Sequence, residues 1–216
     1  QLSQSHSKNI FRTEVFLIQS QGMERMISQA MSDRFTSWCN FKFYHPVIFF
    51  QYISELLGLE FSTEPYERES LTWRLEQLLH DTSDPEMEPL QDYLKGDNKE
   101  LKRFQLARQL ANVFDQYQLM RPDLLSKWER GKGRAGHQHE GWQKFLWQKL
   151  RSQIGETPHK GLLLQKIGSL LSDKNALWGE MLPERVSVVG LNTMPPLFLK
   201  SLAAVANHSD VHLYLL

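Results

Sequence analysis

Short apolar runs, bounded by polar residues, occur near both ends of this chain. Val15–Ile18, Val186–Leu191 and Val211–Leu216 are the clearest of them. The run Val15–Ile18 is typical of a strand that is buried on both faces, as in a parallel sheet, and the other two runs indicate further strands. Apolar residues recur at helical spacing over Met23–Phe35, and a proline pair precedes a further expected helix at Leu197–Ala206. The two ends therefore predict an α/β fold with a parallel sheet made of strand–helix–strand units.

The chain between these ends carries only helical periodicity. No stretch alternates as a strand would, and Gly or Pro residues separate most of the apolar stripes. The expected helices are Ser70–His80, Glu88–Leu94, Asn98–Leu119, Asp123–Arg130, His139–Ile154 and Lys160–Leu171. We therefore predict that residues 1–62 begin an α/β domain, that residues 63–182 form an all-helical insertion, and that residues 183–216 return to the α/β domain.

The composition is that of an ordinary globular protein with a sizeable core. Of the 216 residues, 41% are hydrophobic and 23% charged, and Lys+Arg balance Asp+Glu at 25 each. With no net field, any contact with DNA must be local or assisted by partner subunits. No apolar run approaches the roughly 20 residues that span a bilayer, so we expect a cytoplasmic protein without membrane contact. Polar, unpatterned residues begin the chain and an apolar run ends it, so we expect a fragment of a longer protein.

Cys39 is the single cysteine, which excludes a disulfide within the chain and fits a reducing compartment. Its neighbours include Trp38, Phe41 and Phe43. An aromatic setting of this kind is typical of a buried, unreactive thiol. We therefore expect Cys39 to be buried and not to act as a nucleophile.

An α/β sheet interrupted by helices suggests a nucleotide-driven machine, but the sequence lacks the motifs for nucleotide hydrolysis. There is no G-x-x-x-x-G-K-[ST] phosphate loop, and Gln19–Glu24, after the first apolar run, has one glycine and no lysine. His137 and His139, beside Glu140, could hold zinc only with ligands from elsewhere, and two exposed loop histidines are the commoner case. We therefore expect the fragment itself to be inactive and to hold no cofactor or metal.

The segment Asn112–Asp123 (NVFDQYQLMRPD) gathers polar side chains at the end of the longest expected helix. Asp115 and Gln116 are adjacent, about 100° apart, so they project from different faces. Pro122 ends the helix and displaces Arg121 from helical geometry. Arg, Gln and Asp are side chains that read base edges. The alternative is an ordinary helix end, with Arg121 at the helix dipole and Asp115 paired with a neighbouring helix.

A second candidate is the aromatic segment Asn40–Tyr52, which interleaves rings with basic and amide side chains. Single-stranded bases stack on such rings, at about 1–3 kcal/mol each. Phe49 and its apolar neighbours have the spacing of a helix core. The exposed candidates for base contact are therefore Tyr44, His45 and Gln51.

Four segments, taken together, resemble the family of exodeoxyribonuclease V gamma chains, the RecC subunits of RecBCD helicase–nucleases. These are Phe16–Met23, Asn40–Phe50, the residues Phe114–Tyr117 followed by Arg121–Asp123 and Trp128–Glu129, and Val189–Pro196. Each segment is a weak signal, but their order and spacing make the match specific over nearly the whole chain.

The resemblance implies the fold of the first domains of a superfamily 1 helicase (P-loop NTPase-like), with catalytic motifs lost and a helical subdomain inserted. Gln19–Met23 would match the helicase segment that touches single-stranded DNA. The implied function is to scaffold the complex, split duplex ends and scan the 3′ strand in a channel for the Chi recombination sequence. The implied partners are DNA, as single strands and duplex ends, the beta helicase–nuclease subunit and the alpha helicase subunit of a heterotrimer. ATP and Mg would be used by those subunits.

The resemblance also places the Chi-reading surface on the aromatic–proline segment, on the helix that ends at Arg121 and on a basic residue after a His-containing turn. Arg121 and Lys160 would contact phosphate or guanine, and the other polar residues would contact bases. Gln51 stands where one member of the family has Trp, which removes a face for base stacking. Lys160 stands where that member has Arg, which removes the pair of parallel hydrogen bonds that a guanidinium can donate. The predicted DNA-binding residues are Tyr44, His45, Gln51, Asn112, Asp115, Gln116, Arg121 and Lys160.

A purely structural module is the alternative, in which the same polar residues serve an interface with the helicase subunit. Burial distinguishes the two hypotheses. Exposure of Asp115, Gln116 and Arg121 in an open groove favours DNA contact, whereas pairing inside the helical core favours the structural role.

Overall fold

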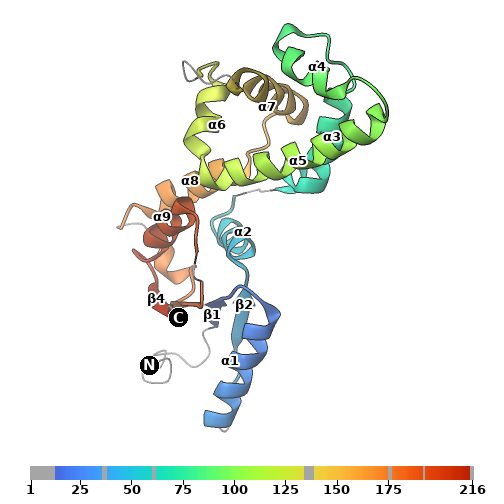
Figure 1. Ribbon diagram of the computed structural model, residues 1–216. Coiled ribbons are helices and arrows are strands. Elements are labelled where there is room, and N and C mark those ends of the chain that lie inside the picture. Colours follow the sequence, from blue (N-terminus) through green and yellow to red (C-terminus); the bar gives the residue numbers. More distant parts are fainter. Residues whose placement is uncertain are drawn as a thin grey trace. The chain divides into compact units, whose positions relative to one another are not determined.

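The structure is a computed structural model that describes residues 13–35, 38–59, 62–133, 139–174, 177–191 and 193–214 (Figure 1). It divides into two compact units. The sheet unit comprises residues 1–61 and 163–216, and the helical unit comprises residues 62–162. The domain boundaries expected from the sequence stay predictions.

The sheet unit is built on a four-stranded sheet, and the strands are parallel, as the sequence predicts. Its strands are β1 (Glu14–Leu17), β2 (Phe41–Tyr44), β3 (Arg185–Val189) and β4 (Asp210–Tyr214), in the order β2-β1-β3-β4. Leu17 lies between Tyr44 on β2 and Val188 on β3, and all three neighbouring strand pairs are parallel. The strands on either side of a helix therefore run in the same direction, which requires crossover connections.

The two central strands are the ones whose apolar runs the sequence shows most clearly. β3 is buried along its whole length, and even its Arg185 is inside, 3.4 Å from the Glu14 carboxylate. The edge strand β2 (FKFY) is not predicted by the sequence analysis, because it alternates aromatic residues with Lys42 and has no continuous apolar run. Its strand conformation depends on pairing with β1.

The helices of the sheet unit have clear local causes. They are α1 (Gln21–Arg34), α2 (Pro46–Leu56), α9 (Pro196–Val205) and most of α8 (Lys160–Leu171), with a short 3-10 helix η3 (Leu177–Glu180). The Ser20 hydroxyl caps α1 by accepting a hydrogen bond from the Met23 N–H at 3.3 Å. Ile27 and Met31, one turn apart, pack α1 against Phe16 and Ile18.

The expectation of a buried thiol at Cys39 is wrong, because Cys39 is exposed. Trp38 takes the apolar side and stacks on Phe41, with ring centroids 3.7 Å apart. The adjacent Cys39 does not share this packing and stays on the solvent side. The aromatic ring, which is half-buried, rather than the sulfur, packs on the apolar cluster there.

The helical unit contains the helices that the periodicity predicts. They are α3 (Arg68–Leu78), α4 (Glu88–Leu94), α5 (Lys99–Met120), α6 (Pro122–Glu129), α7 (Glu140–Ile154) and the first turn of α8, with 3-10 helices η1 (Glu64–Tyr66) and η2 (Pro85–Met87). Their core includes Leu71, Phe114, Trp128 and Trp147, each at most 1% exposed. No helix in the described part of the chain has both the length and the apolar character needed to cross a membrane.

Candidate nucleic-acid interface

The predicted DNA-binding residues are distributed over both units. Tyr44, His45 and Gln51 belong to the sheet unit. The other five, Asn112, Asp115, Gln116, Arg121 and Lys160, belong to the helical unit. Each group is a separate local arrangement of side chains.

Two members of the sheet group lie at the carboxyl end of a parallel strand. Tyr44 is the last residue of β2, and the exposed His45 follows it as the N-cap position of α2. The backbone N–H of Ile18, just past β1, donates to the Tyr44 carbonyl at 3.0 Å, so the ends of both strands lie side by side. Open α/β sheets bind ligands at this edge. Gln51, on α2, is half-buried.

The Tyr44 ring is part of an aromatic cluster that the sequence analysis identifies only in part. It stacks on Tyr52 at 5.2 Å between centroids, and the Lys42 ammonium lies 5.5 Å from the Tyr52 centroid. Burial, followed by the charge of Glu55, raises the pKa of Tyr44 above 10.0, so its hydroxyl stays protonated. The sequence feature that could have identified Lys42 as part of this cluster is its two-residue spacing from Tyr44, because residues two apart lie on one face of a strand.

At the end of α5, Asp115 points toward other parts of the helical unit. The Lys160 ammonium contacts the Asp115 carboxylate at 2.8 Å and the Glu67 carboxylate at 3.2 Å. The Lys160 side chain is only 9% exposed. Since two carboxylates surround one ammonium, Lys160 is engaged in an internal ion-pair network and offers little positive potential to a phosphate.

Arg68 completes this network, and the sequence analysis misses it. Its guanidinium donates to the Asn112 side-chain oxygen at 3.4 Å and lies 3.7 Å from the Asp115 carboxylate. Arg68 is 44 residues away from Asn112 in the chain. No local pattern reveals a contact of that separation, because it depends on how α3 packs on α5.

Gln116 and Arg121, unlike Asp115 and Lys160, lie outside the ion-pair network. Both are exposed, and neither side chain makes a hydrogen bond or ion pair with any residue that the structure describes. The backbone of Arg121 is nevertheless held, since its N–H donates to the Tyr117 carbonyl at 2.9 Å and its own carbonyl accepts from the Leu124 N–H at 3.0 Å. Pro122 begins α6 there. The guanidinium of Arg121 is therefore available to a ligand on a fixed backbone.

A buried polar framework supports this helix end, and the sequence analysis does not identify its residues. Gln118, fully buried, accepts from the Lys160 N–H at 3.2 Å and donates to the Tyr66 carbonyl at 3.3 Å. His159, also fully buried, accepts at Nδ1 from the Gly161 N–H at 3.1 Å and so caps the start of α8. A histidine just before a helix is the only sequence signal for this role.

The candidate zinc ligands do not form a described site. His137 lies outside the described residues. Within those ranges, no group of three or more His, Cys, Asp or Glu side chains is arranged to hold a metal ion. The Glu140 carboxylate accepts a hydrogen bond from the Trp128 indole at 2.8 Å.

Substitution of Lys160 by Met is expected to lower the free energy of unfolding by on the order of 1 kcal/mol. The change keeps the apolar stem but leaves Asp115 and Glu67 without their shared cation, and their partial exposure (22% and 47%) moderates the cost. Denaturant unfolding measures the difference. The control is Lys166→Met on α8, where the lysine is exposed. Equal stability of both variants would contradict a stabilising role for the network.

Comparison with known proteins gives one consistent result. The family model described as "RecC, N-terminal domain" matches residues 1–216. The chain is 33% identical over 211 residues to the RecBCD enzyme subunit RecC of Escherichia coli, covering 94% of the chain and 19% of that protein. It is 31% identical over 217 residues to the RecBCD enzyme subunit RecC of Mycolicibacterium smegmatis, covering 95% of the chain and 18% of that protein. It is 27% identical over 231 residues to the RecBCD enzyme subunit RecC of Haemophilus influenzae, covering 94% of the chain and 20% of that protein. The chain spans about a fifth of the length of these relatives.

Proposed function

Since the chain belongs to the family of RecC N-terminal domains, we propose that it is a non-catalytic, DNA-contacting part of a recombination-repair helicase–nuclease. In this proposal the parallel sheet is that of a degenerate superfamily 1 helicase domain, and the helical unit is its inserted subdomain. The chain guides the 3′ single strand and scans it for a Chi-like sequence. Unwinding and cleavage, with ATP and Mg, belong to the helicase–nuclease and helicase subunits.

The observation that carries the proposal is the state of Arg121. An exposed guanidinium on a fixed backbone is a preorganised group for guanine or for a phosphate, each of which it can contact with two parallel hydrogen bonds. Gln116 is exposed on the last turns of α5, the helix that ends just before Arg121, and its amide can pair with adenine. Since the chain has a formal net charge of +0, such contacts select bases, and partner subunits provide most of the attraction for the strand.

The carboxyl ends of the strands in the sheet unit offer a second candidate contact for DNA. His45 is exposed at the carboxyl end of β2, beside the segment that follows β1. Tyr44 is half-buried, and Tyr52 covers one face of its ring. Tyr44 therefore has at most one face for base stacking, and His45 is the better-placed contact of the two.

A structural role is the second candidate, and it rests on a different observation. Asp115, Asn112 and Lys160 are bound to Arg68 and to Glu67 within the helical unit. These three residues hold the end of α5 in place. We therefore assign the DNA contact to Gln116 and Arg121 and the supporting role to the ion-pair network.

Arg121→Ala is the substitution that tests the proposed function. In the full-length subunit, assembled with its helicase and nuclease partners, unwinding is expected to persist while sequence-dependent attenuation of nuclease activity weakens or shifts. Binding of a single-stranded oligonucleotide is expected to fall several-fold. A phosphate contact of Arg121 predicts that the salt dependence falls by about one counterion, whereas a guanine contact predicts that it stays unchanged.

The matched control is Lys127→Ala, which removes another exposed cation from α6. It is expected to behave as the wild type in both assays. If the Arg121 variant also attenuates at the same sites and to the same extent as the wild type, the helix end does not read DNA.

A further inference from the structure

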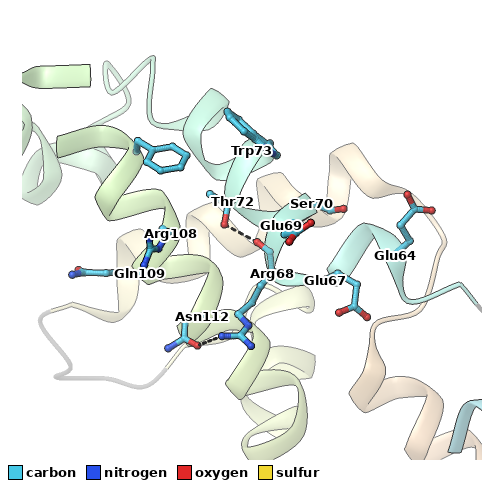
Figure 2. A pocket seen from close by; sticks show the side chains of 11 residues that line it. Glu64, Glu67, Arg68, Glu69, Ser70, Thr72, Trp73, Arg108, Gln109 and Asn112 are labelled. Carbon is cyan, nitrogen blue, oxygen red and sulfur yellow. Dashed lines mark hydrogen bonds between the residues drawn. The ribbon is translucent and has the colours of Figure 1, made fainter. Parts of the chain in front are cut away.

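A groove of about 990 Å³ lies along α3 and α5 of the helical unit (Figure 2). Trp73, Arg108, Glu64 and Glu69 are among the residues that line it. The helices run antiparallel here, since Arg68 contacts Asn112 and Trp73 contacts Phe104. The groove adjoins the ion-pair network at one end, but most of its lining takes no part in the DNA contact proposed above.

One end of the groove is apolar and open to solvent. The Trp73 side chain is 65% exposed, and its ring leans on Phe104 with centroids 5.7 Å apart and the planes at 50°. Leu101, three residues before Phe104, is 56% exposed and lines a second hollow of about 480 Å³ that also includes Phe104 and Arg108. Tryptophan and arginine are enriched among the few residues that carry most of the binding energy of protein–protein interfaces. This end is therefore suited to an apolar anchor residue.

The charged side chains without an ion-pair partner differ in sign between the two sides of the groove. Glu64 and Glu69, on η1 and α3, are exposed and have no side-chain partner among the residues the structure describes. The same holds for Arg108 on α5, on the opposite side from Glu64 in Figure 2. Two other lining residues on this side are paired: Glu67 with Lys160 at 3.2 Å, and Arg68 with Asp115 at 3.7 Å. The unmatched charges are thus acidic on the α3 side and basic on the α5 side.

This charge pattern fits a polypeptide better than a nucleic acid. A sugar–phosphate backbone beside Arg108 would also approach the carboxylates of Glu64 and Glu69, and like charges repel. A polypeptide helix can match both signs, because residues one turn apart on it can carry either charge. Recognition of an amphipathic helix in a groove of this kind is a common mode of peptide binding.

We propose that this groove docks an amphipathic helix of another subunit of the helicase–nuclease, and this inference rests on the proposed function. A bulky apolar residue of the helix lies against Trp73 and Phe104. A Lys or Arg about one turn away faces Glu69, since Glu69 and Trp73 are themselves one turn apart on α3. An acidic residue of the same helix faces Arg108.

Site-specific photo-crosslinking in the assembled complex tests the proposal. Trp73 is replaced by p-benzoylphenylalanine in the full-length subunit, and a second version carries this residue at Tyr93, which is 49% exposed on α4 outside the groove. The expected result is a crosslink from position 73, absent from position 93, to a partner helix with a basic residue about one turn from an apolar one. Crosslinks only to the same chain, only to DNA, or at the level of position 93 would overturn the proposal.

Two substitutions measure the energetics of docking. Trp73→Ala is expected to weaken association of the subunit with its partners by about 30-fold, as for an interface hot spot, whereas Tyr93→Ala leaves it unchanged. Glu69→Lys is expected to weaken association more at low salt than at high salt, because screening reduces charge–charge contacts. Thermal unfolding verifies that each variant is folded. Wild-type affinity in the Trp73 variant would contradict docking at this groove.

The outcomes separate this inference from the function on which it rests. A crosslink at position 73, together with unchanged DNA behaviour of Arg121→Ala, would keep the docking groove and reject the DNA contact. Loss of DNA reading in Arg121→Ala without a crosslink would reject the groove alone. Failure of the wild-type subunit to assemble with the helicase and nuclease would reject the docking proposal together with the assembly part of the proposed function.

Discussion

Gly161→Ala is expected to destabilise the helical unit by about 3 kcal/mol or more, the upper range for overpacked sites. A Cβ at position 161 would overlap the backbone carbonyl oxygen of Gln118, and it would lie 3.0 Å from His159 Cε1 and 3.1 Å from Pro122 Cβ. The Gln118 carbonyl has no helical donor at the next turn, because Pro122 lacks an N–H. Only a glycine lets the start of α8 approach this carbonyl so closely.

The surroundings cannot move aside at low cost. The contacting oxygen is backbone, and the Gln118 side chain is itself tied to Lys160 and to Tyr66. Relief of the overlap would therefore break the hydrogen bonds that hold the end of α5 beside the start of α8. Loss of that framework would also displace Arg121, three residues after Gln118.

Gly168→Ala is the matched control on the same helix. Nothing lies within 4 Å of a Cβ at position 168, so the change is expected to stabilise by up to about 1 kcal/mol through helix propensity. Denaturant unfolding of both variants measures the difference. If Gly161→Ala is as stable as Gly168→Ala, the close approach of α8 to α5 is absent in solution.

Acidification is expected to lower the stability of the helical unit through His159. Burial, followed by the charge of Arg151, lowers the pKa of His159 from 6.5 to about 3. Between these values the unfolded chain binds a proton that the folded chain excludes. The contribution of His159 to stability is therefore complete well above pH 6.5 and is lost as the pH falls toward 3, by about 2 kcal/mol between pH 7 and pH 5.

The contacts around His159 also favour the neutral ring, in agreement with its lowered pKa. Its Nδ1 accepts from the Gly161 N–H at 3.1 Å and from the Leu162 N–H at 3.4 Å, and a protonated ring could accept neither. The Glu129 carboxylate, 3.6 Å from Nε2, favours the cation, but it is already shared with Arg151 at 3.2 Å. Nε2 has no hydrogen-bond partner among the described residues. Loss of the helix cap and desolvation therefore outweigh the attraction of Glu129.

His159→Asn distinguishes this group from the carboxylates that also titrate in acid. Asparagine keeps an oxygen that can cap α8 but does not ionise. We expect it to lower stability at pH 7 through lost packing against Tyr66 and Trp147, and to flatten the decline between pH 7 and pH 5. Denaturant midpoints at pH 5, 6 and 7 measure the slope. An equal slope in the wild type and the variant would show that His159 is not the titrating group.

Local patterns were sufficient for most of the secondary structure. Apolar runs buried on both faces mark β1 and β3, and helical spacing marks α3 through α9, because each of these signals depends only on near neighbours in the chain. The edge strand β2 lacks such a run, and it forms because β1 offers hydrogen-bonding groups beside it. Exposure of Cys39 was likewise decided by which neighbour packs inward.

For the helix end, the sequence determined that Asp115 and Gln116 project from different faces and that α5 stops before Pro122. It did not determine which of the two faces inward. Asp115 is internal because Lys160, 45 residues later, and Arg68 on α3 meet it there. Lys160 also reaches Glu67 across 93 residues. The sequence by itself thus determined the elements and their chemistry, whereas only the packing of distant helices decided which charged groups neutralise one another and which, like Arg121, stay free for a ligand.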